Sequence, residues 1–147
     1  QRYITVSKLQ ELTRKEKWAE LSSFIRSEVY SGGITLDEQN FNQLLFAEKK
    51  LGNWSGILSA YKLLKMQNRE LSGTVVALID QAKAAENLGE IELSLKYFNL
   101  AIEAKPLNEE DKVKQNEIKQ FLANRIFKKW IDVGTGVSDG DTIKNYE

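Results

Sequence analysis

A repeat with a period of 36 to 37 residues is the feature that most constrains the fold. The segments that align without gaps are residues 17–25, 53–61 and 90–98. Trp18, Trp54 and Ile91 share one column, and the intervals are 54 − 18 = 36 and 91 − 54 = 37 residues. Periods of about 33 to 47 residues are typical of helical-hairpin solenoids, in which each unit needs its neighbour to bury its apolar face. The repeat therefore predicts an all-α array of about three hairpins.

Local signals predict where these helices begin. Residues 7–10 and 35–38 have the Ser/Thr-x-x-Glu/Gln form of a capping box, in which the two side chains satisfy free N–H groups of the first turn. Asn53 and Ser72 are suitable N-cap residues for the segments that follow them. We therefore expect helices to start at these four places.

Glycines predict where helices end. Gly52 and Gly89 each follow an apolar-periodic stretch, where a left-handed residue commonly closes a helix. Residues 31–33, Ser-Gly-Gly, form a breaker between the first and second helical pairs. Pro106 is the only proline, which favours helices joined by short turns over a sandwich or barrel.

The C-terminal part of the chain differs from the repeats. Residues 108–130 predict one long helix with a single apolar stripe and otherwise many charges, as expected of a capping helix. The stripe consists of Ile118, Phe121, Leu122, Ile126 and Trp130. After Ile131 the helical pattern ends in a Gly- and Asp-rich segment. We expect a repeat domain over residues 1–131 and an extended or mobile tail over 132–147.

Composition restricts the functional classes. The 147 residues contain 21 Lys+Arg and 21 Asp+Glu, so the formal net charge is zero, which argues against a dedicated nucleic-acid binder. The chain has no Cys and no His, which removes thiol nucleophiles, disulfides and the commonest general base. No apolar run reaches the length of a membrane span. The composition predicts a soluble intracellular protein, and a start at Gln1 leaves a processed organellar form or a fragment open.

No group of residues predicts catalysis or a cofactor. The acidic residues 109–111, and the pair Glu90 and Glu92, are explained by the preference for negative charge in the first turn of a helix. The Gly-rich residues 134–136 lack the flanking strand and helix of a phosphate-binding loop. We expect neither an enzyme, nor a metal site, nor a cofactor.

The third unit resembles a tetratricopeptide repeat, and the second is similar to a pentatricopeptide repeat. The residues that carry the first likeness are Gly89, Ser94, Tyr97, Phe98, Ala101, Ile102 and Pro106. Those that carry the second are Phe41, Asn42, Leu44, Leu45, Lys50 and Gly52. The resemblance covers about residues 3–106. It departs from the tetratricopeptide pattern at Ile57, Leu64 and Arg69, where that family prefers Ala, Ala and Pro, so the subfamily stays open.

In tetratricopeptide proteins the first helix of each hairpin lines a concave groove, and this resemblance implies candidate binding residues. Counted back from Gly52 and Gly89, they are Gln39, Asn42, Phe46 and Lys49 in one unit and Val76, Ile79, Lys83 and Glu86 in the next. Apolar anchors with a few polar groups fit a peptide-binding groove. The alternative is that the apolar members only pack against a neighbouring hairpin.

The aromatic residues of the repeats have two possible roles. They offer a stacking surface or a peptide anchor, or they pack between helices. Recurrence at the structural period favours packing, so Trp54 is expected to be largely buried.

An RNA-binding function of the pentatricopeptide kind would place base recognition on Gln43 and Ala77. That family generally uses Asn, Ser or Thr there, and Ala77 cannot hydrogen-bond a base edge. The sequence therefore favours a non-catalytic protein-binding or assembly module, a subunit or adaptor of a larger complex whose partner is a peptide or helix. The alternative is an organellar RNA-associated repeat protein.

Overall fold

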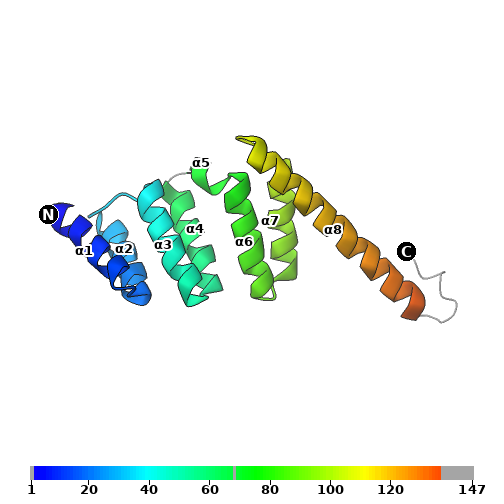
Figure 1. Ribbon diagram of the computed structural model, residues 1–147, viewed down its shortest axis with the longest axis horizontal. Helices are drawn as coiled ribbons and strands as arrows, with labels where there is room; N and C mark the ends of the chain where they lie inside the picture. The colour runs from blue at the N-terminus through cyan, green and yellow to red at the C-terminus, as the bar shows by residue number, and fades with distance from the viewer. Residues whose placement is uncertain (1, 68, 137–147) are drawn as a thin grey trace. The chain divides into compact units, whose positions relative to one another are not determined.

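The computed structural model describes residues 2–67 and 69–136, and these residues form helices and short connections with no strand among them (Figure 1). The helices are α1 (Arg2–Arg14), α2 (Trp18–Ser31), α3 (Glu38–Leu51), α4 (Trp54–Gln67), α5 (Arg69–Ser72), α6 (Val75–Asn87), α7 (Ile91–Glu103) and α8 (Glu109–Gly136). The predicted all-α fold is confirmed. The short helix α5 was not expected from the sequence.

The chain divides into two compact units, Gln1–Ala104 and Lys105–Glu147. The boundary lies inside the single repeat domain that the sequence predicts over residues 1–131. The first unit consists of sequential helical pairs, which we call hairpin 1 (α1–α2), hairpin 2 (α3–α4) and hairpin 3 (α6–α7). Neighbouring helices along this unit pack against one another, as a helical-hairpin array requires.

The turn inside each hairpin has the same backbone geometry. A residue with positive φ lies two positions before the second helix: Glu16 (56°), Gly52 (64°) and Gly89 (81°). The residue after it donates its N–H to the carbonyl five residues back: Lys17 to Leu12, Asn53 to Glu48, and Glu90 to Ala85, at 3.0, 3.0 and 2.9 Å. This is the hydrogen bond of a Schellman motif, which ends a helix at a left-handed residue. The sequence repeat therefore reflects a repeated hairpin turn.

The second helices α2, α4 and α7 begin at the aligned residues Trp18, Trp54 and Ile91. Further along these helices, the buried columns of the alignment are Leu21/Ile57/Ser94 and Ile25/Tyr61/Phe98. Positions four apart lie on one face of a helix, so each second helix turns the same two positions toward the core. The repeat thus fixes which face of these helices is buried.

The expectation that Trp54 is largely buried is wrong. Trp54 is 36% exposed, Ile91 of the same column is 47% exposed, and Trp18 is half-buried. Each is the first residue of its helix, and helical side chains lean toward the N-terminal end. The side chain of a first residue therefore reaches beyond its own helix instead of lying over a preceding turn. Recurrence at this column marks the start of a helix and not the core.

The predicted helix starts are only partly correct. Asn53 is confirmed as a cap, because its Oδ1 accepts the N–H of Gly56 at 3.3 Å. The helix α3 is capped by Asp37 and not by Thr35, and α6 is capped by Thr74 and not by Ser72. In both cases the capping oxygen lies two residues later, where it reaches the N–H of the third helical residue. Residues 7–10 lie inside α1, so the first capping box is wrong.

The predicted helix ends agree with the structure more closely than the predicted helix starts. Gly52 closes α3, Gly89 follows the last turn of α6, and Gly32 closes α2 with a φ of 83°, which confirms residues 31–33 as a breaker. The glycine-rich break lies between hairpins 1 and 2 and leads into residues 34–37. A residue in the left-handed region commonly ends a helix, and glycine adopts this conformation at little cost because it has no Cβ atom.

The second unit contains the long helix α8, which confirms the helix predicted over residues 108–130. Asn108 caps it, since its Oδ1 accepts the N–H of Asp111 at 2.8 Å. The helix continues to Gly136, so the end predicted at Ile131 is wrong. Ile118 of the predicted stripe is buried, whereas Phe121 is exposed. Ile126 and Trp130 of the stripe, and residues 137–147 of the predicted tail, lie outside the side chains and residues that are described.

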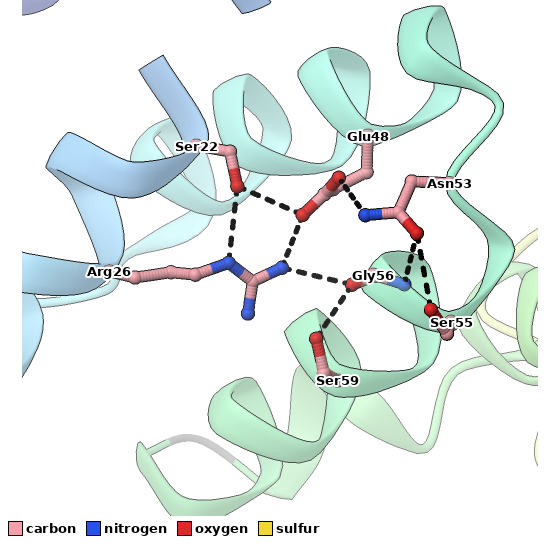
Figure 2. A network of polar contacts seen from close by, with 7 residues as sticks. All are labelled: Ser22, Arg26, Glu48, Asn53, Ser55, Gly56 and Ser59. Carbon is pink, nitrogen blue, oxygen red and sulfur yellow. Dashed lines mark hydrogen bonds and ion pairs between the residues drawn. The ribbon is translucent and has the colours of Figure 1, made fainter. Parts of the chain in front are cut away.

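A polar network joins hairpin 1 to hairpin 2 (Figure 2). The Glu48 side chain on α3 is 3% exposed and forms an ion pair with Arg26 on α2. Its second oxygen accepts from Asn53 Nδ2 at 3.0 Å, and Ser22 donates to the same oxygen as Arg26 at 2.9 Å. Arg26 also donates to the Gly56 carbonyl of α4 at 3.0 Å. One buried carboxylate is therefore bonded to α2 and to the start of α4.

The contact between hairpin 2 and hairpin 3 is made by a different set of polar groups. Asp80 on α6 accepts a hydrogen bond from the Tyr61 hydroxyl of α4 at 2.7 Å. The same oxygen of Asp80 lies 3.3 Å from Lys49 Nζ of α3. Burial, reinforced by the neighbouring Asp80 carboxylate, raises the pKa of Tyr61. Tyr61 therefore stays protonated, and Asp80 ties α6 to both helices of hairpin 2 through Tyr61 and Lys49.

Candidate partner-binding groove

An open cavity of about 770 Å³ lies between hairpin 1 and α3. The residues that line it are Thr13 of α1, Trp18 and Leu21 of α2, and Asp37, Glu38, Gln39, Asn42, Gln43 and Phe46 at and along α3. A volume of about 300 to 1,000 Å³ is the range of sites that hold small ligands or short peptide segments. The cavity is therefore large enough for recognition.

A smaller cavity of about 360 Å³ adjoins the first and shares Asp37, Gln39 and Gln43 with it. Its other lining residues are Val6, Leu9 and Gln10 on α1, Gly32, Gly33, Ile34 and Thr35 between α2 and α3, and Asn40 on α3. We call the two cavities together the α1–α3 groove. In this groove, α1 and α3, the first helices of hairpins 1 and 2, lie beside each other with part of their surface exposed.

The apolar part of the groove centres on an aromatic pair. The rings of Trp18 and Phe46 lie edge to face, with centroids 5.2 Å apart and planes at 81°. Phe46 is still 49% exposed, although Lys50 Nζ lies 5.3 Å from its ring centroid. An edge-to-face pair holds each ring in a defined position. Phe46 is thus a fixed apolar surface that remains open to a partner.

The polar part of the groove includes an acceptor that lacks a partner. The Oε1 atom of Gln43 is buried and has no hydrogen-bond donor among the described residues. Gln43 lines both cavities and is itself half-buried. A buried amide oxygen without a donor costs about 1 to 3 kcal/mol. The oxygen is closed to solvent, so a ligand donor reaches it when the half-buried Gln43 side chain turns toward the groove, and that hydrogen bond would remove the cost.

The charge of the groove is negative. Asp37 and Glu38 line it, and none of the described lining residues is Lys or Arg. Asp37 already accepts the Asn40 N–H at 2.8 Å as the cap of α3. The Glu38 side chain makes no hydrogen bond or ion pair in the described part of the chain. Its carboxylate is therefore available to a cationic group.

The structure brings together only part of the candidate set from the sequence. Gln39, Asn42 and Phe46 line the α1–α3 groove, whereas Lys49 is paired with Asp80. The residues on α6 do not line this groove: Val76 and Lys83 are exposed, Glu86 is half-buried, and Ile79 is buried with 8% exposed. Counting from the glycines found the outward face of α3. It could not show that the open space lies toward hairpin 1.

Sequence reasoning missed the part of the groove that hairpin 1 supplies. Thr13 lies three residues before Glu16, as Lys49 lies three before Gly52, so the repeat register could have located it. Trp18 was interpreted as a packing residue, and it does pack, but on the exposed Phe46. Gln43 was considered only for contact with a base. No pattern in the sequence indicates that its amide oxygen lacks a donor.

A second open cavity, of about 1,070 Å³, lies on the other helices of the first unit. Its lining is apolar at Leu58, Leu93 and Leu100, with Lys62 and Lys65 on α4. This surface differs from the α1–α3 groove in charge, since it carries two lysines and one carboxylate, Glu103, where the groove carries carboxylates and no basic residue. It provides an internal control for experiments on charge.

Three further observations concern metal ligands, the acidic cluster before α8 and membrane spans. Within the described residues, no three His, Cys, Asp or Glu side chains gather to hold a metal ion. The predicted acidic cluster at residues 109–111 serves the start of α8, where Asp111 accepts the Leu107 N–H at 2.7 Å. None of the described helices has both the length and the apolar character needed to cross a bilayer.

Comparison of the chain with family models, with curated proteins and with solved structures gave no match.

Proposed function

We propose that this chain is a non-catalytic protein-binding or assembly module of the tetratricopeptide/pentatricopeptide kind, which acts as a subunit or adaptor of a larger complex. The observation that carries the proposal is the α1–α3 groove, in which an exposed Phe46 is fixed against Trp18 beside a buried amide oxygen that lacks a donor. Rigid aromatic anchors in a groove with a few polar groups are what peptide recognition uses.

The charge of the groove supports a protein partner over RNA. An RNA-binding surface needs cationic side chains along the phosphate backbone. The α1–α3 groove carries Asp37 and Glu38, and no basic residue is found among its described lining residues. The pentatricopeptide positions Gln43 and Ala77 fit this view, because Ala77 is buried and Gln43 lies in the acidic groove.

The experiment is affinity capture from an extract of the cells that make the protein, with and without nuclease, followed by mass spectrometry. We expect a captured protein to persist after nuclease treatment and to be lost with Phe46→Ala, because that change removes the apolar surface of the groove. Circular dichroism and thermal melting should remain close to those of the unmodified chain, since Phe46 is half exposed.

The matched control is Tyr30→Ala. Tyr30 is an aromatic residue on α2 that is 79% exposed and lies outside the groove. A captured protein that depends on Phe46 and not on Tyr30 supports the proposal. Capture of nucleic acid alone, or of proteins that leave with nuclease, contradicts it.

A further inference from the structure

We infer that the α1–α3 groove binds an extended peptide segment that carries a basic side chain next to an aromatic or large aliphatic anchor. This inference rests on the proposed function and specifies the chemistry of the partner. It follows from the available carboxylate of Glu38, the acceptor of Gln43 and the aromatic surface of Phe46.

The charge of the groove selects a basic partner. Glu38 lines the larger cavity and makes no ion pair in the described part of the chain. It is also in the first turn of α3, where no lysine or arginine of the groove lining competes for it. Charge complementarity favours correct partners and penalises like charge. An arginine or lysine on the peptide therefore matches this surface, and an acidic residue opposes it.

The unpaired oxygen of Gln43 selects an extended backbone. Inside a helix the peptide N–H groups are bonded to the carbonyls four residues earlier, so they are not available to a buried acceptor. An extended segment leaves its N–H groups free, as in peptides that add to an exposed edge. An N–H that donates to Gln43 Oε1 would satisfy the oxygen that lacks a donor in the described structure.

The length of the groove sets the length of the segment. Along α1 the lining runs from Val6 to Thr13, seven residues apart, and along α3 from Glu38 to Phe46, eight residues apart. Seven residues of helix rise by about 10 Å. An extended peptide covers that length with about three residues. The groove therefore holds a basic residue, an anchor and one neighbour, which is a short linear motif and not a folded domain.

The test uses the full chain labelled with ¹⁵N and three blocked synthetic peptides. The peptides are acetyl-Ser-Arg-Phe-Arg-Ser-amide, the same peptide with Glu for both Arg, and the same peptide with Gly for Phe. The readouts are the indole N–H signal of Trp18, assigned with Trp18→Phe, and the side-chain amide signal of Gln43. We expect saturable shifts of both signals with the Arg-Phe-Arg peptide, and dissociation constants at least about tenfold higher for the other two peptides.

Variants separate the contributions of charge and hydrogen bonding. Glu38→Gln should weaken binding of the Arg-Phe-Arg peptide about tenfold and reduce its dependence on salt. Gln43→Met, which keeps an unbranched chain of similar size, should weaken binding by a similar factor. The control Glu92→Gln removes an exposed carboxylate from the first turn of α7, outside the groove, and should leave binding unchanged.

The inference is overturned if the acidic peptide binds as tightly as the basic one, or if Glu92→Gln weakens binding as much as Glu38→Gln. It is also overturned if none of the peptides shifts the Trp18 and Gln43 signals. In that last case, a partner whose capture still depends on Phe46 leaves the proposed function intact, while loss of that dependence removes the proposed function as well.

Discussion

The turns inside the hairpins and the contacts between the hairpins follow different rules. In each turn a left-handed residue lies two positions before the second helix, with the same hydrogen bond to the carbonyl five residues back. Between hairpins 1 and 2, by contrast, the polar contact is an ion pair of the partly exposed Arg26 and the buried Glu48. Between hairpins 2 and 3 it is an exposed lysine and a buried tyrosine on Asp80.

One column of the repeat shows the difference most clearly. Glu48 lies 48 − 12 = 36 residues after Leu12 and 85 − 48 = 37 residues before Ala85, so the three residues occupy equivalent positions. Leu12 and Ala85 are buried apolar residues, whereas Glu48 is a buried carboxylate. Backbone geometry repeats because it depends on the turn. The type of side chain at the same position differs between hairpins, because it depends on which residues of the adjacent hairpin pack against it.

The largest expected effect comes from removing Glu48. Glu48→Ala leaves Arg26 and Ser22 without their buried acceptor, and removing one partner of a buried pair costs about 3 to 5 kcal/mol. Because Arg26 is 24% exposed and can turn toward water, we expect the free energy of unfolding to fall by about 3 kcal/mol in urea titrations. Lys49→Ala, which breaks the exposed pair with Asp80, should change it by less than about 1 kcal/mol.

The paired replacement sharpens this result. Glu48→Leu together with Arg26→Met gives hairpin 2 an apolar residue where hairpins 1 and 3 have one, and such replacements are often neutral or stabilising. We expect the double variant to be at least as stable as the unmodified chain. If Glu48→Ala cost less than about 1 kcal/mol, the contact between hairpins 1 and 2 would depend on apolar packing and not on the network.

The next largest effect on stability is expected from a substitution at Gly56 of α4. A Cβ atom on Gly56 would lie 2.6 Å from Cδ of Glu48 and 2.5 Å from Nδ2 of Asn53. Gly→Ala inside a helix normally stabilises by about 0.5 to 1 kcal/mol, but here the added methyl meets a carboxylate held by three donors, which are Ser22, Arg26 and Asn53. We therefore expect Gly56→Ala to lower the free energy of unfolding by about 1 to 2 kcal/mol.

The same substitution in the Glu48→Ala background tests the cause. With the Glu48 carboxylate gone, Asn53 Nδ2 loses its acceptor and can move away from the methyl group of Gly56→Ala. The helix propensity of Ala should then make the change stabilising. Opposite signs in the two backgrounds, measured by chemical denaturation, would tie the glycine to the buried carboxylate. Equal signs would mean that Gly56 has another reason to lack a side chain.

At the contact between hairpins 2 and 3, Tyr61→Phe should cost about 1 to 2 kcal/mol at neutral pH, since it removes the hydrogen bond to Asp80. Tyr61 is buried, and burial and Asp80 raise its pKa in the folded state. A raised folded pKa means that this stabilisation is complete below the unfolded pKa of about 10 and is lost as the pH rises beyond it. Denaturation between pH 9 and 11 should therefore show a shallower fall in stability for Tyr61→Phe, and equal slopes would contradict this assignment.

The sequence predicted the hairpins well because the position of each turn determines where the second helix of the hairpin begins. Gly52 and Gly89 located the turns of hairpins 2 and 3, and the aligned residues 17–25 located the second helix of hairpin 1. It failed at Trp54, where recurrence marked the first residue of a helix and not a core position. It failed at Ser72 because a cap two residues later, Thr74, offers the better geometry.

The candidate groove was predicted only in part, for a physical reason. A helical face can be found from spacing, so Gln39, Asn42 and Phe46 were identified. Which neighbouring helix leaves space beside that face depends on side-chain volumes and ion pairs across the contact. Lys49 lies on the same face but is directed to Asp80, and no spacing in the sequence predicts that pair.

The smallest expected effect returns to the turns, where Glu16 is the exception. It adopts a φ of 56° at the position that Gly52 and Gly89 occupy in the other hairpins. The left-handed region destabilises a residue that has a Cβ atom by about 1 to 2 kcal/mol, whereas glycine has an entropic cost of about 0.5 to 1 kcal/mol on folding. The difference favours glycine at this position.

We therefore expect Glu16→Gly to raise the free energy of unfolding by about 0.5 to 1 kcal/mol, and Gly52→Ala and Gly89→Ala to lower it by a similar amount. The two Gly→Ala substitutions serve as controls, because an added Cβ at Gly52 or Gly89 would meet no atom beyond its chain neighbours within 4 Å. Any loss of stability in these variants would therefore come from the left-handed backbone and not from a steric clash. Chemical denaturation of the three variants measures the same left-handed position in three hairpins. If Glu16→Gly destabilised the chain, the turn of hairpin 1 would have to depend on the glutamate side chain, and the likeness of the turns would be limited to their backbone.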